Sequence, residues 1–468
     1  MQSLNVNNLT FEYKEHSSIF QNVNIAFPLH RFNLLVGPSG SGKSTLLKII
    51  AGLYPQFGGQ LITGDVTITD VNLTTKKHQV AMLFQNPNQQ FTMNTPRNEL
   101  IFVLENLQVD PTQMDAKIDA ALAFVDCAEL ANRNFNTLSG GEKQKVALAV
   151  IVAMDSPVIL LDEPFASVDP TAREYLLTKL TKLRDEHHKT IILAEHDLHG
   201  YQSIADQVFQ INPGANNIVP LEQTARENLF NQFKSTSSTA TISLPADIDE
   251  PVISLINVEL KQQDKPLLKQ AEFSFFKDKI TLITGENGIG KSTLFNAIIK
   301  LMPYQGQITL NDRDIKSIKQ KKLARQVGLV FQDAEDQFLS ITVTEEIELS
   351  KKHRITNYFT DQLIAESLAN LNLAKHLDQV VYSLSDGQKK KLQILLMLIS
   401  GQPILLLDEP LKGLDISSLA TVLALIKKSS QKQHQSIIMI SHQLTKLAGW
   451  VDYHVSFEHQ RLTYQEVL

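Results

Sequence analysis

Two stretches of this sequence combine glycine, lysine and a hydroxyl residue in an order suited to binding a chain of phosphates. GPSGSGKST spans residues 37–45 and GENGIGKST spans residues 285–293. Both fit the pattern G-x-x-x-x-G-K-[ST], and each lies between an apolar run and a stretch with helical periodicity. Glycines let backbone N–H groups point at phosphate oxygens, and the following helix adds the positive end of its dipole. The sequence therefore predicts two sites for the phosphates of a nucleotide.

Each residue type in these motifs has its own expected task. Lys43 and Lys291 are expected to reach the β- and γ-phosphates, and the serines that follow them to offer a hydroxyl to Mg²⁺. The predicted nucleotide-binding residues of the two motifs are Gly37, Pro38, Ser39, Gly40, Ser41, Gly42, Lys43, Ser44 and Thr45, and Gly285, Glu286, Asn287, Gly288, Ile289, Gly290, Lys291, Ser292 and Thr293.

Paired acids follow a second apolar run in each half. Asp162 and Asp408 end the runs VILLD and ILLLD, a position from which a carboxylate meets Mg²⁺ directly or through water. Glu163 and Glu409 come next, and a carboxylate there can take a proton from an attacking water as a general base. The sequence predicts a catalytic glutamate beside each phosphate site.

These motifs recur because the chain contains the same domain twice. Lys43 lies 248 residues before Lys291, Gln85 lies 247 before Gln332, and Asp162 lies 246 before Asp408. Landmarks that keep their order with so small a drift indicate a duplicated domain. The predicted organisation is a first domain at 1–218, a linker at 219–250 and a second domain at 251–468. The linker overlaps the Ser- and Thr-rich stretch 233–251.

The elements that must position these groups are short buried strands alternating with helices. Apolar runs predict strands at 32–37, 157–162 and 190–196, and at 280–285, 403–408 and 436–442. Amphipathic stretches predict helices at 115–131 and 361–374. This alternation predicts an α/β fold, with a mostly parallel sheet that carries helices on both faces.

Composition narrows the class of protein. A length of 468 residues predicts two or three domains, and a net charge of −6 disfavours nonspecific binding to nucleic acid. The single cysteine, Cys127, is interpreted as a buried apolar residue and fits a reducing cytosol. No apolar run reaches the roughly 20 residues of a spanning helix, and the amino terminus does not resemble a signal peptide. We expect any action on a membrane to go through a partner.

One further motif identifies the family that the chain resembles. LSGGE at 138–142 and LSDGQ at 384–388 stand shortly before the paired acids in each half. With the motifs above, they make the chain similar to ATP-binding cassette (ABC) proteins over nearly its whole length. The resemblance implies two tandem P-loop NTPase cassettes, each with a RecA-like α/β core, an antiparallel β subdomain and a helical subdomain. It also implies Mg²⁺-dependent hydrolysis of ATP.

In that family two cassettes pair head to tail, and each ATP lies between the P-loop of one and the signature of the other. Here the pairing would occur within one chain. The resemblance implies that Ser139, Gly140 and Gly141 cap the ATP on Lys291. Ser385 and Gly387 would cap the ATP on Lys43.

The resemblance gives roles to further residues. Gln85 and Gln332 resemble the Q-loop glutamine that senses Mg²⁺ and the γ-phosphate. His196 and His442 resemble the switch histidine that stabilises transferring charge. Tyr13 resembles the aromatic residue that stacks on adenine. The remaining family-like residues are the D-loop aspartates Asp169 and Asp415.

The two halves differ at two of these positions. An offset of 248 residues places Lys261 opposite Tyr13, so the second cassette lacks the aromatic and is expected to bind nucleotide more weakly. Asp386 stands where the first signature has Gly140, and its carboxylate is unfavourable only if it points at a phosphate. Because each half keeps its lysine, acids and histidine, we expect two active but unequal sites.

The residues around the Q-loop favour one kind of transporter. FQNPNQQF at 84–91 and FQDAEDQF at 331–338 resemble a segment of energy-coupling-factor (ECF) importers of vitamins and metal ions, although residue 334 is Ala instead of Pro. The resemblance implies an integral-membrane coupling subunit whose arginines meet acids such as Asp333, Glu335 and Asp336. A substrate-binding membrane subunit would complete the complex at the cytoplasmic face of the cell membrane, where the ATPase is peripheral.

Two other classes stay open. A monosaccharide-type ABC importer ATPase usually has a degraded second P-loop, whereas GENGIGKST is intact. Tandem ABC ATPases that act on ribosomes usually carry a long charged helical segment between their cassettes, which the Ser- and Thr-rich linker does not resemble.

Overall fold

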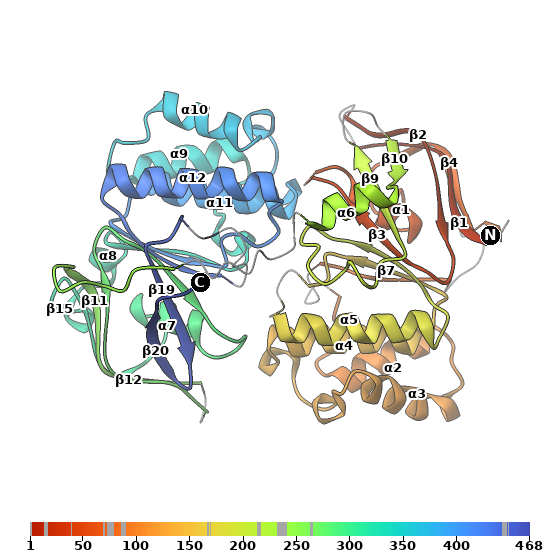
Figure 1. Cartoon of the computed structure of the whole chain (residues 1–468), viewed down its shortest axis with the longest axis horizontal. Coiled ribbons are helices and arrows are strands. Elements are labelled where there is room, and N and C mark those ends of the chain that lie inside the picture. The colour runs from red at the N-terminus through yellow and green to blue at the C-terminus, as the bar shows by residue number, and fades with distance from the viewer. Residues whose placement is uncertain are drawn as a thin grey trace. The chain divides into compact units, whose positions relative to one another are not determined.

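The computed structural model divides the chain into two compact units, residues 1–234 and 235–468. The residues it describes are 2–13, 17–38, 40–68, 71–72, 79–85, 90–165, 168, 170–212, 217–231, 241–262, 265–441, 447 and 449–468. Each unit contains one antiparallel sheet, one mostly parallel sheet and a group of helices (Figure 1). This is the predicted arrangement of two cassettes.

The first unit has a four-stranded antiparallel sheet and a six-stranded sheet. The former has the order β2 (Ser17–Pro28), β1 (Ser3–Tyr13), β4 (Gln60–Ile68), β5 (Val71–Asn72). The latter has the order β10 (Asn217–Pro220), β9 (Gln207–Asn212), β3 (Phe32–Val36), β8 (Thr190–Ala194), β7 (Val158–Asp162), β6 (Val80–Leu83). Only β10 runs antiparallel to its neighbour in the second sheet.

Helices and a second sheet cover the two faces of the parallel sheet. The helices are α1 (Lys43–Ile50), α2 (Pro96–Asn106), α3 (Pro111–Phe124), α4 (Gly140–Met154), α5 (Pro170–Asp185) and α6 (Gln223–Asn231), with short 3₁₀ turns at Ala128–Leu130 and Phe135–Thr137. Along β3, Leu34 packs into the core shared with α2–α5, and Leu35 packs into the core shared with α1 and the antiparallel sheet. A strand buried on both faces explains why its sequence is a continuous apolar run.

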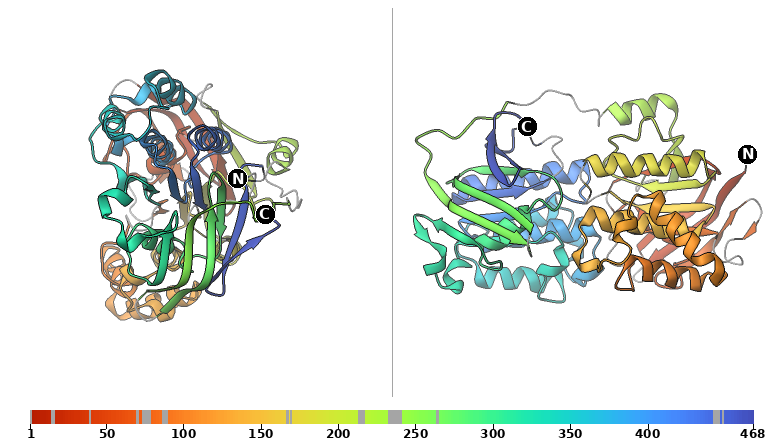
Figure 2. Two further views of the ribbon diagram at one scale, coloured as in Figure 1. Left: turned by 90° about the vertical axis from the view of Figure 1, so that its left-hand side faces the viewer. Right: turned by 90° about the horizontal axis from the view of Figure 1, so that it is seen from below.

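The second unit repeats the same plan. Its sheets have the orders β12 (Lys265–Phe276), β11 (Pro251–Gln262), β14 (Gln305–Leu310), β15 (Arg313–Asp314), and β16 (Val327–Val330), β17 (Ile404–Asp408), β18 (Ser436–Ile440), β13 (Ile280–Thr284), β19 (Tyr453–Glu458), β20 (Arg461–Gln465). Its helices are α7 (Lys291–Ile298), α8 (Gln320–Leu323), α9 (Val343–His353), α10 (Asp361–Asn370), α11 (Asp386–Ser400) and α12 (Ile416–Gln433), with 3₁₀ turns at Ile315–Ser317, Ala334–Gln337, Ala374–His376 and Val381–Ser383. Figure 1 and the left view of Figure 2 both show α10–α12 gathered on one side of this unit and the antiparallel sheet on the other.

The two predicted helices are shorter than their amphipathic stretches. The stretch 115–131 corresponds to α3, which ends at Phe124, and the stretch 361–374 corresponds to α10, which ends at Asn370. Asp126 and Asn372 have φ angles of 48° and 58°, so the chain turns through the left-handed region and cannot continue as a helix. Apolar residues beyond these turns kept the helical spacing in the sequence without belonging to the helix.

The predicted linker, 219–250, has flanks that pack on the adjoining units. Phe230 of α6 is buried in the first core, and the Arg226 guanidinium donates to the carbonyl oxygens of Ala205 and Asp206 at 2.7 and 3.0 Å. On the other side, Ile242 is buried in a core of the second unit, and Thr241 forms a β-bridge with Val467.

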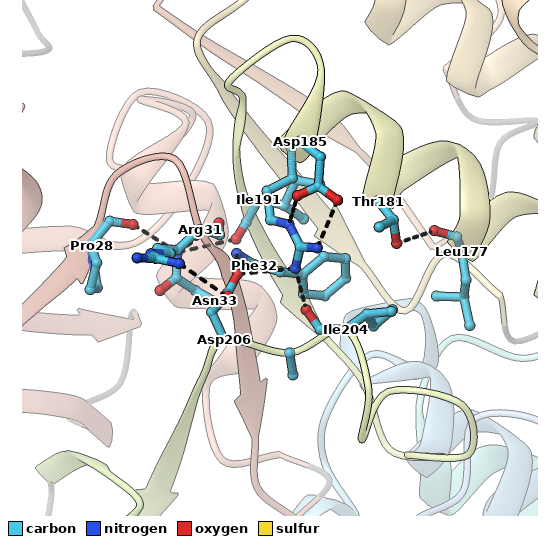
Figure 3. Close-up of polar contacts among 12 residues, drawn as sticks. Pro28, Arg31, Phe32, Asn33, Leu177, Thr181, Asp185, Ile191, Ile204 and Asp206 are labelled. Atoms are coloured by element: carbon cyan, nitrogen blue, oxygen red, sulfur yellow. Dashed lines mark hydrogen bonds and ion pairs between the residues drawn. The ribbon is translucent and has the colours of Figure 1, made fainter.

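A polar cluster holds the first parallel sheet at the end opposite the phosphate loop (Figure 3). Asp206, just before β9, accepts hydrogen bonds from the Phe32 N–H at 2.8 Å and the Arg184 guanidinium at 3.1 Å. The Arg31 guanidinium approaches the other carboxylate oxygen at 3.4 Å. The buried Asn33 side chain donates to the carbonyl oxygens of Pro28 and Ile191. The carboxyl end of α5 and the amino ends of β3 and β9 are thereby fixed to one another.

Candidate functional site

In each cassette a helix starts at the lysine of the phosphate motif. α1 begins at Lys43 directly after β3 and its loop, and α7 begins at Lys291 after β13. The Lys43 ammonium donates to the carbonyl oxygens of Gly37 and Pro38 at 2.9 and 3.1 Å. The Lys291 ammonium donates in the same way to Gly285 and Glu286, both at 2.8 Å. Each lysine therefore folds back over its own loop, where phosphates would bind.

Glycine is required where each loop turns into its helix. Gly42 and Gly290 have φ angles of 98° and 119°, which disfavour any side chain. A Cβ atom on Gly42 would also lie 2.8 Å from the Phe20 ring, and one on Gly290 would lie 3.0 Å from Leu267. Glycine therefore lets each loop pack closely against β2 or β12 as it turns into its helix. The predicted loop residue Ser39 lies outside the described residues.

A buried carboxylate meets the hydroxyl of each motif. The Ser44 hydroxyl donates to Asp162 at 2.9 Å, and Ser292 hydrogen-bonds to Asp408. Burial, and then the neighbouring charge of Glu163, raise the pKa of Asp162 to about 6. Burial also raises the pKa of Asp408. A hydroxyl and a buried carboxylate that converge in this way are the hard oxygen donors that Mg²⁺ prefers, so both sites fit the cation.

The two predicted general bases share an uncommon backbone conformation. Glu163 and Glu409 have φ angles of 44° and 46°, in the left-handed region that residues other than glycine rarely adopt. Their N–H groups donate to Ala194 and Ile440 at the ends of β8 and β18, at 2.9 and 3.1 Å. The same strained conformation occurs at both positions, a pattern found where structure serves function.

In the first cassette the structure brings together three residues predicted from separate motifs. Gln85 Nε2 donates to one Glu163 carboxylate oxygen at 3.0 Å, and His196 Nε2 lies 2.6 Å from the other. Glutamate, glutamine and histidine thus converge beside Asp162. In the second cassette His442 lies outside the described residues, and the Gln332 side chain is exposed.

Tyr13 lies beside the first phosphate loop. Its hydroxyl is 2.9 Å from the Thr45 hydroxyl, and its ring makes edge contacts with Phe11 and Tyr54. Burial raises the pKa of Tyr13 to about 12, so its phenol stays protonated. The contact with Tyr54 was not predicted, because nothing in the spacing of that residue relates it to the motif.

The strand register corrects the residue placed opposite Tyr13. Tyr13 pairs with Ser17, whereas Lys265, the counterpart of Ser17, pairs with Gln262. Gln262, and not Lys261, therefore occupies the position of Tyr13. The offset along this strand is 249 residues instead of 248, because bulges interrupt both strand pairs. The absence of an aromatic residue at this position of the second cassette still holds.

Both signature motifs begin a helix with the same cap. Ser139 and Ser385 are the N-caps of α4 and α11, and each forms a capping box with the residue three positions later. Gly140, Gly141 and Gly387 lie in the first turns of these helices. The Asp386 carboxylate lies 3.6 Å from the Lys389 ammonium of the same turn, which offsets its charge. A helix amino terminus also favours an acid at that position.

Asp415, the second predicted D-loop aspartate, is the N-cap of α12 and accepts a hydrogen bond from the Ser418 N–H at 2.8 Å. Its counterpart Asp169 lies outside the described residues.

A charged cluster centred on the buried Glu195 lies behind His196 and was not predicted from the sequence. Glu195 is fully enclosed and accepts hydrogen bonds from the His196 N–H and the Tyr201 hydroxyl. The Arg173 guanidinium lies over the Tyr201 ring at 5.4 Å and pairs with Asp197 at 2.5 Å. Burial raises the pKa of Glu195 to about 7. We call Arg173, Glu195, Asp197 and Tyr201 the switch cluster. Arg173 is distant in sequence from the other three residues, so nothing in the sequence indicated its contacts with them.

Comparison with known proteins identifies the family. The model of a family described as "ABC transporter" matches residues 20–166 and 268–412, which include both phosphate loops and both pairs of acids. The chain belongs to the ABC transporter family. It is an ATP hydrolase whose hydrolysis is coupled to transport.

Relatives match almost the whole chain. A Bacillus subtilis protein named "Putative HMP/thiamine import ATP-binding protein YkoD" is 29% identical, over 96% of this chain and 88% of its own length. A Methanosarcina acetivorans protein named "Putative ABC transporter ATP-binding protein" is 28% identical, over 91% of this chain and 82% of its own length. A Streptococcus mutans protein of the same name is 29% identical, over 90% and 82%. The tandem arrangement is therefore shared.

Solved structures share the fold. A structure titled "RNase-L Inhibitor" superposes with a TM-score of 0.61 and 19% identity, over 96% of this chain and 87% of its own. The archaeal ribosome recycling factor aABCE1, solved with the ribosomal stalk protein aP1, gives the same values. At this identity the likeness establishes the fold alone. Among the described residues, no helix is long and apolar enough to cross a membrane.

Proposed function

We propose that the chain is the energy-coupling ATPase of an ECF-type importer, peripheral at the cytoplasmic face of the cell membrane. It would drive uptake of a vitamin, a vitamin precursor or a metal ion. The observation that carries the proposal is an exposed apolar surface beside the Q-loop of the second cassette. Four side chains form it, and we call them the coupling patch: Leu339, Ile341, Val380 and Tyr382, with exposed fractions of 83%, 66%, 44% and 51%.

The four residues lie on two segments that the structure joins. The Val381 N–H donates to the Ile341 carbonyl oxygen at 2.9 Å, and Thr342 forms a β-bridge with Val380. The rings of Phe338 and Tyr382 meet edge to face, with their centroids 6.5 Å apart. Exposed large apolar residues that gather in this way are typical of an interaction site.

Acidic residues border the coupling patch. Asp333 and Asp336 are exposed on the segment just before Leu339. Glu335, which the sequence also offered for a partner's arginines, pairs instead with Lys389 of α11 at 2.5 Å. An apolar surface with an acidic edge suits an amphipathic helix that carries arginine. The membrane coupling subunit would supply that helix.

The relatives support the importer reading and the substrate class. The Bacillus subtilis protein, similar over nearly the whole chain, is named for import of HMP or thiamine. A separate membrane subunit would bind the substrate, so its identity lies outside this chain. The ribosome-related structures support no second function, because their likeness is one of fold.

For hydrolysis, we propose that Mg²⁺ is held by Ser44, Gln85 and Asp162 in one cassette and by Ser292, Gln332 and Asp408 in the other. When bound, the cation would offset negative charge on the β- and γ-phosphates. Lys43 and Lys291 would leave their loop carbonyls for the phosphate oxygens. Glu163 and Glu409 would take a proton from the attacking water. In the first cassette, the contacts of Gln85 and His196 orient the Glu163 carboxylate for this step.

The signature helices would complete the sites when the cassettes pair head to tail, as the family resemblance implies. Ser139, Gly140 and Gly141 would then bind the ATP on Lys291. Ser385 and Gly387 would bind the ATP on Lys43. Their capped helix amino termini are suited to a γ-phosphate.

Affinity purification from detergent-solubilised membranes tests the proposal. The bait carries Glu163→Gln and Glu409→Gln together, to hold ATP without turnover. We expect a small coupling protein and a substrate-binding membrane protein to co-purify. A second bait that also carries Leu339→Glu and Ile341→Glu should lose both while keeping its melting temperature. A sugar permease without a coupling protein would contradict the ECF assignment, and ribosomal proteins without membrane subunits would contradict the transporter role.

A further inference from the structure

A lysine is buried where the signature helix of the second cassette meets the Q-loop. Lys390 lies in the first turns of α11 and is 3% exposed. Its ammonium donates to the carbonyl oxygens of Phe331 and Gln332 at 3.1 and 2.9 Å, and to Gln393 Oε1 at 3.0 Å. All three bonds are within range of good hydrogen-bond geometry. The side chain therefore spans from the signature helix to the backbone of the Q-loop.

Gln393 extends this connection one turn further along α11. It is completely buried, and its Nε2 donates to the Phe331 carbonyl oxygen at 3.0 Å and to Gln337 Oε1 at 2.8 Å. Gln337 in turn accepts from the Phe331 N–H at 3.3 Å. The backbone just before Gln332 is thus bound at both its N–H and its carbonyl group.

Among its described residues, the first cassette has a counterpart of the Gln337 contact but none of the contacts that Lys390 and Gln393 make. Gln90 binds the Phe84 N–H at 3.0 Å, as Gln337 binds that of Phe331. The residues 246 positions before Lys390 and Gln393 are Gln144 and Ala147. Gln144 is also buried, but its Nε2 has no hydrogen-bond partner in the part of the chain that the structure describes. The Q-loop of the first cassette is held instead by its own side chain, through the bond from Gln85 to Glu163.

We infer that Lys390 is a positioning residue that fixes the Q-loop of the second cassette to its signature helix, and so places Gln332 for hydrolysis at the Lys291 site. The inference rests on the roles proposed above for Gln332 and Glu409. Its physical basis is that a buried ammonium must keep its acceptors, because losing them leaves a charge unsolvated. The Q-loop carbonyls therefore stay on α11 while the exposed Gln332 side chain remains available to the nucleotide. Lys390 does not touch the reacting atoms.

The test compares Lys390→Met with Gln144→Met in the full-length chain. Methionine keeps the length and packing of either side chain but removes its donors. In a Glu163→Gln background, which leaves turnover to the Lys291 site, steady-state ATP hydrolysis should show a kcat at least threefold lower for Lys390→Met. The KM for ATP should change less than twofold, because the P-loop still binds the nucleotide. Gln144→Met should keep kcat within about twofold of the parent. Lys390→Arg, which retains charge and donors, should recover at least half of the lost kcat.

Hydrogen exchange supplies a readout that does not depend on turnover. The amides of residues 331–336 should exchange at least tenfold faster in Lys390→Met, with no change at residues 84–85. Fluorescence of Trp450, the single tryptophan of the chain, reports whether the second cassette remains folded. A Lys390→Met variant that is folded and matches Gln144→Met in kcat and exchange would overturn the inference.

Glu409→Gln separates this inference from the proposed hydrolysis role. If Glu409→Gln lowers turnover and Lys390→Met does not, the positioning role alone is wrong. If neither substitution changes turnover, the second site does not hydrolyse ATP and both assignments are wrong.

Discussion

The two cassettes share the lysine, serine, aspartate and glutamate expected to act on the phosphates and Mg²⁺, and they differ in the residues that hold those groups in place. Each keeps the lysine that binds its own loop, the serine–aspartate contact and a glutamate in the left-handed conformation. Behind His196, the first cassette has the switch cluster, which is centred on the buried Glu195. The second has Leu419, Ser441 and Leu447 at the positions of Arg173, Glu195 and Tyr201. Instead, it buries Lys390 on its signature helix, where the first cassette has Gln144. We infer that the same chemistry is supported by residues around His196 in one cassette and by the signature helix in the other.

The largest expected effect tests whether both sites hydrolyse ATP. Glu163→Gln combined with Glu409→Gln should lower phosphate release by about 100-fold or more, because a general base contributes roughly 10²–10⁴-fold. Each single variant should keep measurable turnover, to unequal extents. Glutamine keeps the shape of the side chain, so ATP binding serves as the control. Equal losses in the two single variants would contradict the difference between the cassettes.

The switch cluster should make the stability of the first cassette depend on pH. The pKa of Glu195 is raised from 4.5 to about 7, so the folded state binds the proton more tightly than the unfolded chain. Stability is then highest below pH 4.5 and falls as pH rises through the window up to about 7. Glu195→Gln should reduce the loss of stability between pH 5 and pH 8 by about 2 kcal/mol.

Calorimetry of the full chain at the two pH values measures this effect. Trp450 fluorescence follows the second cassette, which has Ser441 at the equivalent position and should not respond. An unchanged pH dependence of the first transition in Glu195→Gln would show that Glu195 does not carry the titration.

The coupling patch has polar counterparts in the first cassette. Thr92, Asn94, Asn134 and Asn136 stand at the positions of its four members, and all are exposed. Leu339→Glu with Ile341→Glu should reduce recovery of membrane subunits about tenfold, since a desolvated contact would acquire two charges. Thr92→Glu with Asn94→Glu is the matched control and should change recovery little. Equal losses from the two pairs would mean that both cassettes present the same kind of docking surface.

The smallest effect concerns adenine. In a Lys291→Ala background, which leaves one intact P-loop, Tyr13→Ala should raise the Kd for ATP about fivefold, at the lower end of base-stacking energies. Tyr13→Phe removes only the bond to Thr45 and should raise the Kd less than twofold. Fluorescent-nucleotide titration measures both variants. Equal Kd values for Tyr13→Ala and the parent would show that this ring does not stack on the base.

The sequence was enough to predict the loop-to-helix structure of the phosphate motifs, because that structure depends on local spacing. Gly42 and Lys43 must be adjacent for a loop to become a helix, so the motif records the structure directly. The register opposite Tyr13 was missed because a β-bulge adds a residue without changing the apolar pattern.

The sequence also could not show which charged side chains are buried or paired. The run Lys389–Lys391 looks like an exposed stripe, yet all three lysines are buried. Lys389 pairs with Glu335, and Lys390 donates to two Q-loop carbonyl oxygens. Which lysines find such partners depends on contacts between segments more than 50 residues apart. The pairing of Arg173 with Asp197 was hidden for the same reason, since nothing in either local sequence requires the other.

The polar cluster around Asp206 has a mechanical consequence. α5 is 16 residues long, so about 24 Å separates the end held by Arg184 from the end that follows Glu163. Because Arg184 holds this end of α5, a small displacement at the other end would rotate the helix about Arg184. In the second cassette the matching aspartate, Asp452, still holds the Ile280 N–H, but Ser430 replaces the arginine and bonds instead to Gln435. An ion pair between Arg184 and Asp206 thus holds the carboxyl end of α5 to its sheet. At the equivalent position of α12, Ser430 cannot form an ion pair with Asp452.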